Sequence, residues 1–175
     1  LVDYNNESGD PLFIACVTND TDTSLLDVTT QGATPTVLVS GLTSGFFKYT
    51  HFATSGGIFA YYVNNADAAI LYDGTTWHEV TTTSTPYAIT GPTDTIFKDV
   101  VSHKRRLWFA QDNSMKCWYL PTDQIAGAAQ SFDFAPVFPR GGKIVKIDTW
   151  SLDAGTGLDD YFVVFTTEGE VAVYT

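Results

Sequence analysis

The chain has 175 residues and a formal net charge of −11, because 20 Asp and Glu residues stand against 9 Lys and Arg residues. This acidic balance opposes general adhesion to nucleic acid or to an anionic membrane, since both need cation-dense surfaces. No apolar run approaches the roughly 20 residues of a membrane-spanning helix, so no membrane segment is expected in this chain.

The composition favours strands over helices. Val, Ile, Thr, Tyr, Phe and Trp are abundant, and good helix formers never gather at helical spacing. We therefore expect an all-β protein. The chain begins with Leu1 and ends inside a strand-like run, which indicates a fragment of a longer protein.

Four hairpins are predicted in chain order, each an apolar strand, a short polar turn and a second strand. Their turns lie near residues 20, 65, 113 and 168. The spacing is therefore about 45 to 55 residues, which is typical of propeller blades. The strands before the turns cover residues 12–17, 58–63, 107–110 and 161–165, and those after them cover 24–27, 68–72, 115–120 and 170–174.

Further strands are predicted around these hairpins. Residues 46–52, 97–103 and 144–150 precede three of them, and a polar outer strand such as 77–81 follows. The sequence thus predicts repeated antiparallel four-stranded blade-like units, forming a β-propeller or partial propeller. We expect a single all-β module over residues 1–175, with a loop at 84–92, one short helical turn at 121–130 and repeats near 1–45, 46–93, 94–143 and 144–175.

A single blade cannot bury both of its faces, so neighbouring blades must pack against each other. Large aromatic side chains on the predicted strands are the natural filling between blades. The residues expected to pack there are Phe13, Phe59, Trp77, Trp108 and Phe162.

A glycine-rich bend at residues 153–160 carries three aspartates, Asp153, Asp159 and Asp160. Carboxylate oxygens on a flexible loop suit Ca²⁺, although no bidentate Glu follows at the required offset. The alternative interpretation is a solvated hairpin loop. Cys16 and Cys117 each lie in an apolar run without a CxxC partner, so we expect buried thiols and neither a disulfide nor a metal site.

The only basic cluster is His103, Lys104, Arg105 and Arg106, at a turn before a predicted strand. It is a candidate interaction patch for DNA phosphate or for an acidic neighbouring subunit, and the alternative is a solvated hairpin turn. The sequence lacks a GxSxG elbow, a Walker loop and a GxGxxG motif, so no enzyme activity and no cofactor are predicted.

Several stretches carry a resemblance to a known family. They are residues 104–121, 127–133, 138–142 and 158–174, which include Leu-Trp-Phe-Ala at 107–110 and Glu-Gly-Glu-Val-Ala-Val-Tyr at 168–174. With these stretches, roughly residues 46–175 of the chain resemble tailed-bacteriophage and prophage virion proteins, known as structural or DNA-stabilisation proteins, and residues 1–45 match less clearly. Its repeat plan alone is similar to that of tail hub or nozzle proteins.

The resemblance implies a virion component, assembled in the bacterial host cytoplasm, that forms a homo-oligomeric ring with other virion subunits as partners. Phage DNA would pass through it non-specifically, along an acidic surface. The family pattern contains no catalytic residues.

Two other classes of function remain open. A carbohydrate-binding module for host receptor recognition would use exposed Trp77, Trp118 or Trp150 as a stacking platform. A glycosidase-like propeller would need an arginine cluster, yet Arg105, Arg106 and Arg140 are the only arginines in the sequence.

Overall fold

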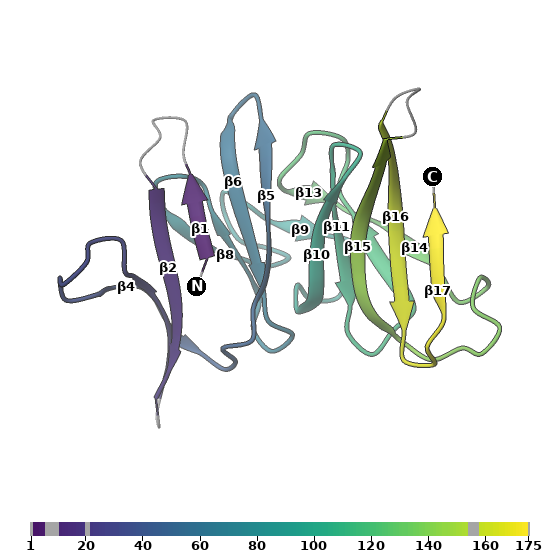
Figure 1. The fold of residues 1–175 in the computed structure, drawn as a ribbon, viewed down its shortest axis with the longest axis horizontal. Helices are drawn as coiled ribbons and strands as arrows, with labels where there is room; N and C mark the ends of the chain where they lie inside the picture. Colours follow the sequence, from purple (N-terminus) through teal and green to yellow (C-terminus); the bar gives the residue numbers. More distant parts are fainter. Residues whose placement is uncertain (1, 6–10, 20–21, 154–157, 175) are drawn as a thin grey trace.

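The computed structural model describes residues 2–5, 11–19, 22–153 and 158–174, and the side chains of residues 152–159 lie outside that description. Every regular element among the described residues is a β-strand (Figure 1). The all-β prediction is therefore confirmed. The described residues include no helix long and apolar enough to cross a bilayer.

Consecutive strands form antiparallel sheets that follow one another along the chain. The first sheet contains β1 (Val2–Asn5), β2 (Pro11–Thr18), β3 (Thr23–Asp27) and β4 (Thr36–Leu42). The second contains β5 (Lys48–Thr54), β6 (Gly57–Val63), β7 (Ala69–Tyr72) and β8 (Trp77–Val80). The third contains β10 (Phe97–His103), β11 (Arg106–Gln111), β12 (Lys116–Tyr119) and β14 (Gln130–Asp133).

The fourth sheet differs because its described part has three strands, β15 (Ile144–Asp153), β16 (Leu158–Thr166) and β17 (Val171–Tyr174). In all four sheets, spatial order follows chain order, although the chain between β12 and β14 passes through β13, which pairs elsewhere. The sheets themselves follow one another along the long axis of the molecule, from purple to yellow in Figure 1.

Apolar side chains fill the spaces between successive sheets. The first junction, between the first and second sheets, contains Tyr4, Ile14 and Leu25 facing Ala60, Tyr62 and Ile70. The second junction brings residues such as Tyr61 and Leu71 against Phe97, Leu107 and Phe109. The third brings Ala110, Cys117 and Phe134 against Ile147, Phe162 and Val164.

The second and third sheets are apolar on both faces. In β6, Phe59, Tyr61 and Val63 belong to the second junction, whereas Ala60 and Tyr62 belong to the first. This is the alternation of side chains along a strand, with an apolar environment on either side. Such strands read as continuous apolar runs, which explains why residues 58–63 carry no polar residue.

The region expected to hold a helical turn, residues 121–130, contains no helix, so that prediction is wrong. Asp123 has a positive φ of 58° and Gly127 one of 117°, both incompatible with a right-handed helix. The segment leads instead into β13 (Gly127–Ala128), which pairs in parallel with β9 (Ile89–Thr90). This pairing connects the segment after β8 with the segment between β12 and β14. Tertiary pairing thus overrides the local preference of an Ala-rich stretch.

Candidate functional site: the first-strand surface and the basic turn

The first strands of the second, third and fourth sheets lie side by side, with β10 between β5 and β15 (Figure 1). A groove of about 480 Å³ runs across them, and it is lined by residues 47–50, 99–102 and 146–149. Its charged residues are Lys48, Asp99, Lys146 and Asp148. The groove thus carries two cations and two carboxylates.

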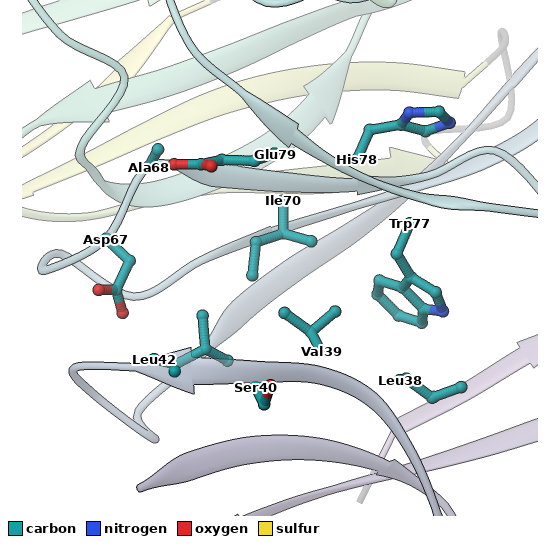
Figure 2. Close-up of a pocket in the computed structure, with 11 residues that line it drawn as sticks. Leu38, Val39, Ser40, Leu42, Asp67, Ala68, Ile70, Trp77, His78 and Glu79 are labelled. Carbon is teal, nitrogen blue, oxygen red and sulfur yellow. The ribbon is translucent and has the colours of Figure 1, made fainter.

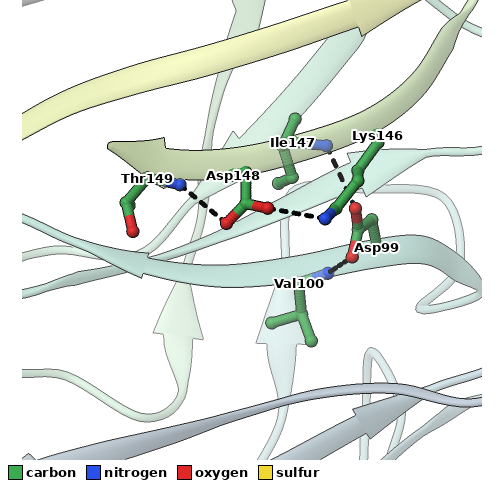
Figure 3. A network of polar contacts seen from close by, with 6 residues as sticks. All are labelled: Asp99, Val100, Lys146, Ile147, Asp148 and Thr149. Atoms are coloured by element: carbon green, nitrogen blue, oxygen red, sulfur yellow. Dashed lines mark hydrogen bonds and ion pairs between the residues drawn. The ribbon is translucent and has the colours of Figure 1, made fainter. Parts of the chain in front are cut away.

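Asp99 is the buried charge of this groove, with 4% of its surface exposed. Figure 3 shows that one carboxylate oxygen accepts the Val100 N–H at 3.0 Å, and the other accepts the Ile147 N–H of β15 at 3.0 Å. The register of β10 shifts beside Asp99, and the register of β15 shifts just before Ile147, as in β-bulges. Asp99 therefore ties the third sheet to the fourth.

Burial raises the pKa of Asp99, and the two backbone N–H groups oppose that rise by stabilising the carboxylate. Next to it, Lys146 Nζ donates to Asp148 at 2.6 Å, and Asp148 also accepts the Thr149 N–H at 2.9 Å (Figure 3). Partial burial would raise the pKa of Asp148, but these hydrogen bonds outweigh it and lower the pKa. No local pattern in the sequence signals this network, because the network depends on register shifts in β10 and β15, two strands that lie far apart in the chain.

The predicted basic cluster lies at the hairpin between β10 and β11. Lys104 and Arg105 form its two-residue turn, with φ values of 46° and 59°. Two consecutive positive φ values define a type I′ turn, where Asn and Gly are the preferred residues. Two long basic side chains are therefore held in a backbone conformation that costs free energy in L-residues.

The four basic-cluster side chains have different surroundings. Arg105 forms a two-pronged ion pair with Asp123, with Nε 3.0 Å from one carboxylate oxygen. Arg106 lies over the Tyr119 ring at 5.6 Å and donates to the Leu120 carbonyl. His103 is 7% exposed, and burial together with the Lys104 charge lowers its pKa. Lys104 is exposed and makes no hydrogen bond to a described residue.

Beside this turn lies a pocket of about 220 Å³, which we call the aromatic pocket. His103, Lys104 and Arg106 contribute to its wall, together with the aromatic residues Trp108, Phe132, Phe134, Phe162 and Tyr174. The Trp108 Nε1 and the His103 Nδ1 are buried, and neither has a hydrogen-bond partner among the described residues. The basic turn thus lies at the edge of an aromatic wall between the third and fourth sheets.

A further pocket of about 290 Å³ lies between β4 and β8. Figure 2 shows Val39, Ile70 and Trp77 together at its centre and Asp67 at one end. Asp67 accepts the Thr43 N–H at 2.8 Å and the Asn64 amide at 2.6 Å. Burial works against these bonds, but together they lower the pKa of Asp67, so this carboxylate caps the connection from β4 to β5.

No family model, curated protein or solved structure matches this chain.

The aromatic residues expected between blades occupy different faces. Phe59 belongs to the second junction, Trp77 to the first, and Trp108 and Phe162 to the third, where their rings lie 4.7 Å apart. Phe13 is different, because it is 37% exposed and belongs to none of the three junctions. Its neighbours Leu12 and Ile14 face the second sheet, so alternation along β2 turns Phe13 to the opposite face.

The candidate calcium residues fall largely outside the described part of the chain. This is true of the loop at 154–157 and of the Asp153 and Asp159 side chains. Asp160 is exposed and accepts a hydrogen bond from the Ser151 hydroxyl. Within the described residues, no group of three or more His, Cys, Asp or Glu side chains is arranged to hold a metal ion. Cys16 is half-buried, Cys117 is buried, and both are free thiols.

Proposed function

We propose that this chain is a structural module of a bacteriophage virion, in a tail hub, nozzle or head-to-tail connector, that acts as scaffold and DNA conduit through subunit contacts. The observation that carries the proposal is the continuous surface of β5, β10 and β15, the first strands of three successive sheets. In a ring of blades, the first strands face the central axis. The groove across them would then line the channel.

The blade interpretation of the fold is part of this proposal. It is supported by meanders that follow one another in the chain and by three apolar junctions between successive sheets. In a stack of this kind, the apolar face of each sheet is buried only when a neighbouring sheet covers it, as in repeat proteins. The resemblance of roughly residues 46–175 to phage virion proteins suggests the biological setting.

The charge pattern of the groove suits a passage better than a binding site for DNA. Lys146 is neutralised by Asp148, and Lys48 is balanced by the buried Asp99 in the same groove. Strong DNA binding requires many unpaired cations along the phosphate path. A surface with paired charges holds the polyanion weakly, so DNA could move along it.

Immunogold electron microscopy of purified virions that carry this chain would test the assignment. We expect label at the tail or at the junction between head and tail, with unlabelled capsids as the internal control. Label on the capsid shell alone, or no label on intact and tail-enriched particles that contain the chain by immunoblot, would overturn the proposal.

A carbohydrate-binding module is the second candidate, and one observation favours it. Trp150 of β15 is 60% exposed, and it pairs across the strands with Tyr161. Exposed aromatic faces are suited to stacking on sugar rings. A glycan array with the wild-type chain and a Trp150→Ala variant separates the candidates, because a conduit shows no sugar preference and a receptor-binding module loses its signal in the variant.

A further inference from the structure

Both walls of the pocket between β4 and β8 are formed by described residues. One wall is β4 of the first sheet, and the other is formed by β8 and by the loop before β7 in the second sheet. The volume of this pocket, about 290 Å³, is near the lower end of the range for small-molecule sites. An occupant of the size of an amino acid or a small amine would therefore fit.

The charge in this pocket has one sign. Among its lining residues, all of which the structure describes, Asp67 and Glu79 carry carboxylates, and there is no lysine or arginine. His78 belongs to the lining, but its imidazole bonds to Asp73 at 2.8 Å, and its register partner Leu71 faces the second junction. The lining side chains therefore present mainly hydrogen-bond acceptors to an occupant.

The two carboxylates lie toward the same end of the pocket. Glu79 pairs with Ile70 across β7 and β8, and Asp67 precedes β7 in the loop from β6. Figure 2 shows both carboxylates at the end near Ala68 and the Trp77 indole at the other end. Glu79 is exposed, and its carboxylate makes no hydrogen bond to a described residue. This charge is thus available to an occupant.

Trp77 provides the apolar end of the pocket. Its ring stacks on Tyr72, with the centroids 4.6 Å apart, and its centroid lies 5.3 Å from that of Tyr62. These two tyrosines hold the indole in place. Along β8, Trp77 and Glu79 are two positions apart, which corresponds to about 7 Å. An occupant therefore meets an apolar surface at one end of the pocket and negative charge at the other.

The geometry points to a binding site for an organic cation: we propose that the pocket between β4 and β8 binds a small molecule with a primary ammonium group on an apolar body. The ammonium lies between the carboxylates of Asp67 and Glu79, because it donates three hydrogen bonds and accepts none. The apolar body contacts Trp77. A sugar suits this lining less well, since its hydroxyl groups need donors as well as acceptors. The proposal rests on this pocket and not on the virion assignment, so either can fail without the other.

The test is an NMR titration of the whole chain with 2-phenylethylamine. We expect saturable binding with a Kd of about 1 mM, and shifts centred on the Trp77 indole N–H and the methyl groups of Val39 and Ile70. 2-Phenylethanol keeps the ring and has a hydroxyl in place of the ammonium, so it should bind roughly fivefold more weakly. Ethylamine keeps the ammonium and lacks the ring, so it should bind roughly tenfold more weakly.

Glu79→Gln is the decisive variant, because it removes one charge from an exposed side chain and preserves its size. We expect the variant to weaken 2-phenylethylamine binding about threefold, as for an exposed ion pair. Glu168→Gln is the matched control. It makes the same change in net charge at an exposed position of the turn between β16 and β17 in the fourth sheet, and should leave the Kd unchanged.

Four results would overturn the proposal. The first is equal binding of 2-phenylethylamine and 2-phenylethanol. The second is an equal effect of Glu79→Gln and Glu168→Gln, which would indicate general attraction of a cation to an acidic protein. The third is a set of shifts outside this pocket, and the fourth is tighter binding of methyl glucoside than of the amine at the same residues. If Glu79→Gln does not fold, the comparison of the two ligands on the wild type still decides.

Discussion

Replacing Lys104 with asparagine should stabilise the protein. Lys104 occupies the first central position of the type I′ turn with a φ of 46°, and its exposed side chain makes no hydrogen bond with a described residue. The left-handed conformation costs an ordinary L-residue about 1–2 kcal/mol, whereas asparagine adopts it more readily. We therefore expect the Lys104→Asn variant to gain about 1 kcal/mol in its free energy of unfolding.

Thermal and urea unfolding measure this gain directly. For a chain of this size, about 1 kcal/mol corresponds to a rise of about 2–4 °C in Tm. Lys104→Ala is the matched control, because it removes the same charge and side chain but leaves a residue that prefers negative φ. We expect Lys104→Ala to stay within about 0.5 kcal/mol of the wild type.

The two variants separate the effect of backbone strain on stability from the effect of charge repulsion. Equal stabilisation by asparagine and alanine would show that relief of repulsion among Lys104, Arg105 and Arg106 is responsible, and not the backbone. Destabilisation by asparagine would refute the strain argument. Arg105→Gly is a less clean test, since it also removes the ion pair with Asp123, worth about 0.2–1 kcal/mol at an exposed site.

Four further predictions concern the core and its buried groups. Asp99→Ala leaves the N–H groups of Val100 and Ile147 without an acceptor, and should cost about 2–4 kcal/mol in urea unfolding. Because the pKa of Asp99 is raised on folding, its contribution to stability is largest at low pH and is lost as pH rises through the folded pKa. The stability of the wild type relative to Asp99→Asn should therefore increase as pH falls from about 7 to about 4, and a decrease would contradict the assignment. Phe109→Ala should cost about 3–5 kcal/mol and Phe13→Ala under about 1 kcal/mol, since Phe109 is fully buried and Phe13 is 37% exposed; similar losses would disprove the placement of Phe13 outside the junctions. Burial raises the thiol pKa of Cys117, so a thiol reagent should label half-buried Cys16 in the native protein and Cys117 only after unfolding. Rapid native labelling of a Cys16→Ser variant would contradict this order.

The hairpins were predictable because their signals are local. The predicted strand at 58–63 corresponds to β6, and that at 97–103 to β10, since apolar runs bounded by turn residues leave little freedom. A local signal of this kind is also present at Asp73, whose carboxylate accepts the Thr75 and Thr76 N–H groups at 2.9 and 2.7 Å within the turn before β8. The division into repeats and the single-module expectation remain predictions.

Features that depend on contacts between distant segments were not predictable. β9 pairs in parallel with β13 in the region where a helical turn was predicted. The two paired strands lie more than thirty residues apart in sequence, so no local pattern indicates their pairing. Phe13 and Phe59 each lie within an apolar run on a predicted strand. They differ because no described sheet covers the face of β2 that carries Phe13, whereas Phe59 is buried against the third sheet. Asp99 looks like an ordinary strand residue until the bulges in β10 and β15 bring it to the Ile147 N–H.

The basic cluster combines a feature that could be predicted from the sequence with one that could not. Its position at a turn was evident from the residues, and the aromatic pocket beside it was not. That pocket draws on residues from His103 of β10 to Tyr174 of β17, which lie 71 positions apart in the sequence.

The two-faced strands of the middle sheets have a consequence for how substitutions combine. Along β6, Tyr61 and Tyr62 are adjacent in sequence but contact different sheets, whereas Tyr61 and Phe109 are in edge-to-face contact across the second junction. Energetic coupling in double-mutant cycles should then be strong between Tyr61 and Phe109 and weak between Tyr61 and Tyr62. Substitutions at adjacent positions of such a strand would therefore accumulate almost independently. A substitution that compensates for one of them would arise in the neighbouring sheet that the substituted residue contacts.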